Sequence, residues 1–133
     1  MAFRLGTTAR NGAANGIVDT IDQGSGAGLL KVYTSTQPAS VGGTYGTLLG
    51  TLTFSDPAFG NAATGVATAS AITSDTSADN SGTAGTFAIL DSDSNVLMDG
   101  TCGLGSGEAS FDNNVVVAGG TLAFSSFTVT QPI

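Results

Sequence analysis

The stretch that decides the fold is Thr86-Phe87-Ala88-Ile89-Leu90-Asp91-Ser92-Asp93-Ser94-Asn95-Val96-Leu97-Met98-Asp99-Gly100. Two apolar runs flank five polar residues, a pattern that predicts a β-hairpin with a longer loop. Because successive strand side chains point to opposite faces, Phe87 and Ile89 share one face, where Val96 and Met98 can oppose them. The other face is apolar as well, so we expect the hairpin to lie in the middle of a β-domain with both faces covered.

Other apolar runs have the length and flanking turn residues of short strands. They cover residues 29–34, 47–54, 66–72, 115–117 and 122–124. In the run 47–54, Leu48, Leu52 and Phe54 are expected to face inward. Gly119-Gly120 predicts a two-residue turn that pairs the last two runs as a hairpin.

The final apolar run contains a change of phase. A β-bulge at Ser125-Ser126 would keep the apolar residues on both sides of it in the core, namely Leu122, Phe124, Phe127 and Val129. Together these elements predict a mainly-β fold, a β-sandwich or jelly-roll-like arrangement of seven to eight strands over residues 29–130.

Residues 8–22 carry the helical period of the chain, with an apolar stripe formed by Ala14, Ile17, Val18 and Ile21. Thr7 or Thr8 can cap the start of this helix, and Gly24 suits its end. We expect the stripe to be buried internally, for instance on one face of the central hairpin. The spacing of Gly12 and Gly16 leaves open that the helix instead approaches a partner closely.

Composition limits both domain count and partners. The 133 residues predict a single domain (1–133), with residues 1–7 as an N-terminal arm before the helix. Ten acidic residues against Arg4, Arg10 and Lys31 give a net charge of −7. Nucleic-acid binding requires clustered cations to neutralise phosphates, and anionic membrane surfaces attract basic segments, so neither partner is expected. The sequence also lacks a run of about 20 apolar residues and a signal-peptide core at its start.

Charged residues make up only 10% of the chain, against about 25% in an ordinary soluble domain. The mean hydropathy is +0.25. Two interpretations remain open: neutral surface loops on a robust β-domain, or surfaces that pack against other copies or another protein.

The residues of most catalytic sites are missing. The chain has no His, which excludes Ser-His-Asp, Cys-His and His-based metal sites. The lone Cys102 is expected to be a small buried apolar residue. Asp91-Ser92-Asp93-Ser94-Asn95 resembles the start of a calcium loop, but Val96 replaces the required glycine and Cys102 the twelfth-position Glu, so a turn is expected. We expect no enzyme activity, no cofactor and no metal.

Several stretches resemble small virion proteins of tailed bacteriophages. They are Met1–Thr7 with Ala9-Arg10-Asn11 and Ile17-Val18-Asp19, then Leu30–Thr34 with Gln37-Pro38-Ala39, Leu52–Gly60 and Ser81–Gly85. Related sequences have Gly in the Asp-Ser-Asp-Gly-Asn turn, where this chain has Ser94. Members of this kind with a role resemble head decoration (cement) proteins on the outer face of the capsid.

The resemblance implies a structural protein of the virion capsid surface, made in the host bacterial cytoplasm. Its implied partners are the major capsid protein and other copies of itself, as a homo-oligomer on the capsid lattice. Phe3, Arg4 and Leu5 of the arm, or the helix stripe, would contact the shell. The alternatives are a neck or tail component and a displayed carbohydrate- or receptor-binding module. Such modules use exposed aromatic side chains, for which the candidates are Tyr33, Tyr45 and Phe59.

Overall fold

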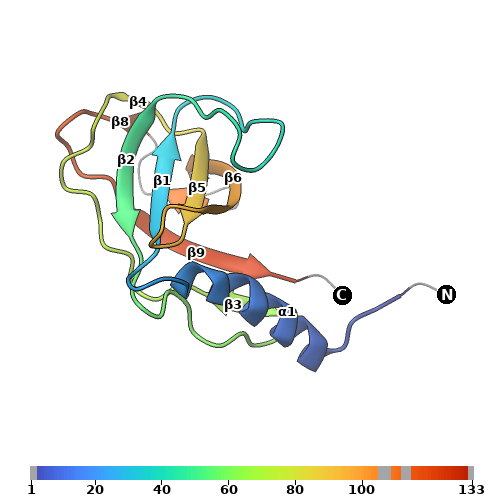
Figure 1. Ribbon diagram of the computed structural model, residues 1–133. Helices are drawn as coiled ribbons and strands as arrows, with labels where there is room; N and C mark the ends of the chain where they lie inside the picture. Colours follow the sequence, from blue (N-terminus) through green and yellow to red (C-terminus); the bar gives the residue numbers. More distant parts are fainter. Residues whose placement is uncertain (1–2, 105–108, 112–114, 132–133) are drawn as a thin grey trace.

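Figure 1 shows the computed structural model of the protein, which describes residues 3–104, 109–111 and 115–131. An α-helix and a short 3-10 helix precede the strands. In chain order the elements are α1 (Thr7–Asp19), η1 (Thr20–Asp22), β1 (Leu29–Tyr33), β2 (Leu48–Thr53), β3 (Val66–Thr68), β4 (Gly82–Thr83), β5 (Thr86–Leu90), β6 (Val96–Leu104), β7 (Ala109–Phe111), β8 (Val115–Val116) and β9 (Phe124–Thr130). The predicted mainly-β fold with an N-terminal helix is confirmed.

The predicted hairpin is formed by β5 and β6, which lie inside the larger sheet. That sheet has the order β2-β1-β5-β6-β7-β9-β3, and β4 pairs with β8 separately. All five residues of β5 are buried between neighbouring strands and the core. Ile89 pairs with Met98, as the alternation predicted. Val96 pairs with Leu90 instead of opposing Phe87 or Ile89, because a register shift leaves Leu97 as an extra residue in β6. Among the described strands β6 and β7 form the parallel pair.

Register shifts interrupt three of the described strand pairs, and the one between β1 and β2 decides which side chain of β2 reaches the core. Tyr33 pairs with Leu48 and Val32 with Gly50, which leaves Leu49 as an extra residue in β2. Leu49 is therefore buried and Leu48 only half-buried, so the inward assignment of Leu48 is wrong.

The bulge predicted near the end of the chain is confirmed. Ser126 pairs with Ser110 and Phe124 with Phe111, so Ser125 is the extra residue. Phe127 is buried beyond this bulge, on the same core as Leu122 before it.

The hairpin predicted across Gly119-Gly120 is wrong. The chain does turn there, with the amide of Gly120 donating to the carbonyl of Val117 at 2.8 Å. However, the turn is held by Ala78, which exchanges backbone hydrogen bonds with Gly119 and Gly120. Because these bonds direct the flanking segments apart, β8 pairs with β4, and β9 pairs with β7 and β3.

The helix covers β3 and β9 rather than the β5–β6 hairpin (Figure 1). Ala14 and Val18 of α1, and Ile21 of η1, are buried in the core, whereas Ile17 is half-buried. The expected internal role of the stripe is thus confirmed with a different set of strands. Neither threonine caps the helix: Gly6 precedes it and Thr7 already belongs to it, so the arm ends at Gly6.

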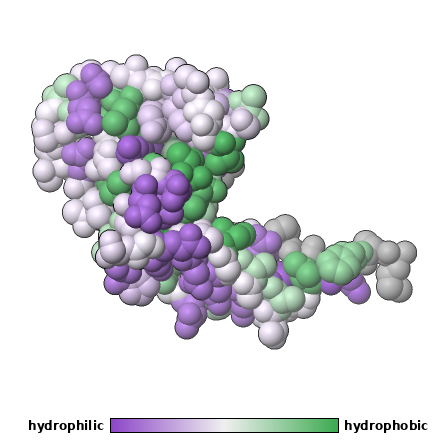
Figure 2. Space-filling view, in the orientation of Figure 1, coloured by the Kyte–Doolittle hydropathy of each residue, from purple (hydrophilic) through white to green (hydrophobic). Residues whose placement is uncertain are grey.

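Packing of the helix also shapes the surface. In the view of Figure 2, hydrophilic residues cover much of the part that contains α1. Apolar residues gather in the indentation between that part and the strand-rich body.

Candidate functional site

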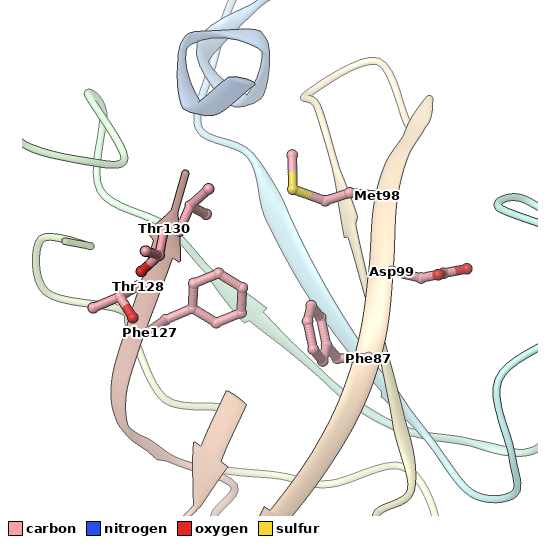
Figure 3. Close-up of a pocket in the computed structure, with 7 residues that line it drawn as sticks. Phe87, Met98, Asp99, Phe127, Thr128 and Thr130 are labelled. Atoms are coloured by element: carbon pink, nitrogen blue, oxygen red, sulfur yellow. The ribbon is translucent and has the colours of Figure 1, made fainter. Parts of the chain in front are cut away.

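A cleft lies between β6 and β9 (Figure 3). β7 stands between these strands, pairing with the end of β6 and with the start of β9. β7 pairs with neither Met98 of β6 nor Val129 of β9, and no other described strand lies between these two residues. The cleft has a volume of about 220 Å³ and is lined by Phe87, Met98, Asp99, Phe127, Thr128, Val129 and Thr130. Small-molecule sites usually measure about 300–1,000 Å³, so this cleft suits one or two side chains.

Two aromatic rings form the floor of the cleft. The rings of Phe87 and Phe127 meet edge to face, with centroids 5.2 Å apart and planes inclined at 88°. Met98 and Val129 are half-buried and packed against the core. In Figure 3, Met98 extends into the space below α1, toward the strand that carries Phe127. The interior of the cleft is therefore apolar.

Backbone groups form the two edges of the cleft. Ala69 donates to the carbonyl of Phe127 and Gln131 donates to Gly65, so residues 127, 129 and 131 direct their peptide groups toward β3. By strand alternation, the peptide groups of Thr128 and Thr130 point the other way, toward β6. The cleft thus has a strand edge that no described strand pairs with.

The alternation of peptide-group directions also applies to β6, which forms the opposite edge of the cleft. The amide of Cys102 donates to Gly85, on the β5 side of β6. Residues of the opposite parity, including Asp99, therefore direct their peptide groups away from β5 and toward the cleft. In Figure 3 the Asp99 side chain points away from the phenylalanine rings, in agreement with this alternation.

The Asp99 carboxylate binds the loop between β1 and β2. It accepts hydrogen bonds from the Tyr45 hydroxyl at 2.7 Å and from Gln37 Nε2 at 2.6 Å. Tyr45 stacks on Tyr33, with ring centroids 4.8 Å apart. Burial, followed by the hydrogen bond to Asp99, raises the pKa of Tyr45, so the phenol stays protonated at neutral pH.

The structure separates the three aromatics that were candidates for carbohydrate binding. Tyr33 and Tyr45 lie together, each half-buried. Phe59 is 7% exposed and packs against Phe54 and Phe127 in the core. Its assignment as a surface aromatic is wrong, because its ring completes the aromatic packing beneath β9.

The arm is the most exposed apolar part of the described chain. The Phe3 side chain is 87% exposed, Arg4 is exposed and Leu5 is half-buried. Gly6 has an extended conformation, with φ −73° and ψ 170°. In Figure 1 the arm leaves the start of α1 and extends away from the strands.

The calcium-like stretch is a turn in this structure. Asp91 Oδ1 accepts hydrogen bonds from the amides of Asp93 and Asn95, and Asp91 Oδ2 accepts one from Asn95 Nδ2 at 3.0 Å. The side-chain hydrogen bond from Asn95 and then the backbone bonds lower the pKa of Asp91. Ser94 has φ +68°, a left-handed conformation that favours Gly. Within the described ranges, no group of three or more acidic or Cys side chains is arranged to hold a metal ion.

Polar side chains of α1 and η1, which the sequence pattern did not single out, bind the loop that precedes β3. Asn11 Oδ1, Asn15 Oδ1 and Asp22 Oδ1 accept hydrogen bonds from the amides of Gly65, Ala62 and Ala58, at 2.7–2.8 Å. The sequence could have revealed this polar face, because residues 11, 15 and 22 have the spacing that places them on one side of a helix.

The cations and the cysteine differ in their surroundings. Arg10 donates to the carbonyls of Gln131 and Thr64, and so helps to hold the end of β9 near the helix.

Lys31 is half-buried in β1. Cys102 packs against the core but is half-buried, so it is less buried than the small core residue that was expected.

Comparison of the sequence with protein-family models finds no match, and neither the curated proteins nor the solved structures yield one. In the described part of the chain, no helix has the length and apolar character needed to cross a membrane.

Proposed function

We propose that this protein is a structural component of a bacteriophage virion, most specifically a decoration protein that binds the outer surface of the capsid and stabilises the shell. The observation that carries the proposal is the exposed apolar arm beside a well-packed β-body. An aromatic side chain that is 87% exposed contributes nothing to the packing of its own chain. It becomes favourable when a partner covers it, because burial removes its apolar surface from water.

The arm is the element proposed to make contact on the particle, through Phe3, Arg4 and Leu5. The alternative anchor, the apolar helix stripe, is used within the molecule, since Ala14 and Val18 are buried. The two proposed partners of the arm are the major capsid protein and other copies of this chain. A sparsely charged surface supports either contact, because charged residues are depleted at the centre of interfaces.

We propose a binding role without catalysis or cofactor. Three of the acidic side chains in the described region hold the fold: Asp91 in its turn, Asp22 at the loop before β3, and Asp75 at the amide of Thr51. A pair of carboxylates flanking an open substrate site, which glycosidases require, is not assembled by these residues.

The experiment is a titration of purified capsids that lack this protein. Saturation at hundreds of copies, in a fixed ratio to the shell subunits, is the expected result. Phe3→Ala should weaken binding, whereas Val41→Ala, which truncates another exposed apolar side chain, should not. A handful of copies would support the neck or tail alternative, and the absence of binding would contradict the role on the capsid shell.

A second candidate function is favoured by the cluster around Tyr45. Stacked tyrosines beside an amide and a carboxylate supply the ring faces and planar hydrogen-bonding groups that sugar sites use. Binding on a glycan array that is lost in Tyr45→Ala and retained in Val41→Ala would support a displayed carbohydrate-binding module. An array without signal for the native protein would remove this candidate.

A further inference from the structure

We propose that the tyrosine site, the face formed by the stacked rings of Tyr33 and Tyr45 with Lys31 and Asp99, binds an acidic saccharide whose carboxylate is held by Lys31 and the Tyr33 hydroxyl. This inference rests on the second candidate function, carbohydrate binding at Tyr45. It names the class of saccharide and the side chain that selects it.

The strand register places Lys31 beside the tyrosine rings. β1 lies between β2 and β5 (Figure 1). Lys31 and Tyr33 are two residues apart in β1, so their side chains leave the same face of the sheet about 7 Å apart. Leu30 and Val32, which alternate with them, are fully buried in the core. Lys31 and Tyr33 are only half-buried, so both can contact a molecule that lies against the rings.

Asp99 marks the other end of the same face. Lys31 pairs with Ala88 of β5, and Ala88 pairs with Asp99 of β6. Two strand spacings of about 4.8 Å therefore separate the backbones of Lys31 and Asp99. The tyrosine site has a cation at one end and a carboxylate at the other, which suits a ligand with an anionic group at one end and hydroxyl groups at the other.

The hydrogen-bond donors that remain open belong to Lys31 and Tyr33. The Tyr45 hydroxyl donates to Asp99 and accepts from the amide of Gly42 at 3.1 Å, so its proton is already used. Within the described part of the chain, no residue forms a hydrogen bond or ion pair with the Lys31 ammonium or the Tyr33 hydroxyl. Burial raises the pKa of Tyr33, so its hydroxyl keeps a proton to donate at neutral pH. An ammonium and a phenol together match a group that only accepts, as a carboxylate does.

The charges on this face set the orientation of the ligand. The net charge of the chain is −7, but solution ions screen distant charges beyond about 8 Å at physiological ionic strength, so the contact with Lys31 dominates. Asp99 repels a carboxylate at its own end and accepts hydrogen bonds from hydroxyl groups there. The acidic group therefore lies at the Lys31 end of the site.

A glycan array of matched pairs tests the proposal. Each acidic oligosaccharide, containing uronic or sialic acids, is printed beside its methyl ester, which keeps the rings and hydroxyl groups but removes the negative charge. We expect the native chain to bind the acids about tenfold more tightly than the esters, as one charge-assisted contact provides. Lys31→Gln should reduce this preference to less than about twofold, whereas Lys31→Arg should retain it because the guanidinium keeps the charge.

A matched control separates the contact made by Lys31 from the net charge. Thr8→Asp, at an exposed position of α1, lowers the net charge by the same one unit as Lys31→Gln and should leave the preference unchanged. Urea unfolding of each variant ensures that the preference is compared among folded proteins.

Equal binding of acids and esters, or a preference that survives Lys31→Gln, would overturn the proposal. Binding of neutral glycans that is lost in Tyr45→Ala would also overturn it, while leaving carbohydrate binding in place with another class of ligand. An array without any signal would remove the inference and the carbohydrate-binding candidate together. The capsid titration stays a separate test of the decoration role, because it does not depend on Lys31.

Discussion

The ring of Phe87 in β5 meets the ring of Phe127 in β9 edge to face, with centroids 5.2 Å apart. This contact joins two strands that are not neighbours in the sheet, and it forms the floor of the cleft. Both side chains are almost fully buried, at 2% and 4% exposed. The contact therefore connects the stability of the body with the shape of its candidate binding site.

Truncating this floor should strongly destabilise the protein. Phe127→Ala removes a ring that also packs against Phe59, and such core truncations cost about 3–5 kcal/mol of unfolding free energy. Urea unfolding followed by circular dichroism measures the loss. Phe3→Ala is the matched control and should leave the unfolding midpoint unchanged, because Phe3 is exposed. Equal effects of the two substitutions would contradict the assigned packing.

Relief of backbone strain should stabilise the loop before β3. Thr64 has φ +50°, a left-handed conformation that is unfavourable for a β-branched residue by about 1–2 kcal/mol. Thr64→Asn should therefore raise the unfolding free energy by about 1 kcal/mol, since Asn tolerates this conformation. Thr44→Asn, in another exposed loop, should change it by less than about 0.5 kcal/mol. A destabilised Thr64→Asn variant would contradict this prediction, because it would show that the threonine side chain stabilises the fold by more than the backbone strain destabilises it.

Protonation of Asp91 should loosen the central hairpin. Its pKa is lowered in the folded protein, first by the side-chain hydrogen bond from Asn95. A lowered folded pKa means that the stabilisation is present in full above the unfolded value, about 3.9, and is lost as pH falls through the folded value. Unfolding midpoints should therefore decrease as pH falls below about 4, and Asp91→Asn should reduce this dependence. Asp93→Asn, at an exposed position in the same loop, should preserve it.

Removing the polar face of the helix should free the loop locally. Asn11→Ala with Asn15→Ala deletes the acceptors for the amides of Gly65 and Ala62. Each lost hydrogen bond costs about 1 kcal/mol, and each alanine returns up to about 0.7 kcal/mol of helix propensity. We therefore expect little change in global stability, but faster hydrogen exchange at those two amides. Asn61→Ala should leave their exchange unchanged, and unchanged exchange in the double variant would contradict the assigned contacts.

Local patterns predicted much of the fold. The alternation around Ile89 and Met98 identified the central hairpin, and the change of phase after Phe124 identified the bulge at Ser125. The helix was predicted because its apolar residues recur at helical spacing, and this spacing identifies the side that is buried. Each of these signals lies within about fifteen residues of sequence.

Other features depend on pairings between distant segments, which no local pattern specifies. β8 pairs with Gly82–Thr83, more than thirty residues earlier, and so the glycine turn after Val117 does not make a hairpin. Leu49 is buried because a bulge forms against Val32 and Tyr33. The cleft arises where β6 and β9 continue past β7, so the sequence predicted that Phe127 faces inward but not that it borders an open site.

Capsid occupancy is the measurement that tests the central claim most directly. Purified capsids that lack this protein are titrated with the native chain and with Phe3→Ala, and bound copies per capsid are counted at saturation. The account predicts hundreds of native copies in a fixed ratio to shell subunits, and a higher concentration for half-saturation by Phe3→Ala. Absence of bound protein, or a handful of copies per particle, would contradict the role as a capsid decoration protein.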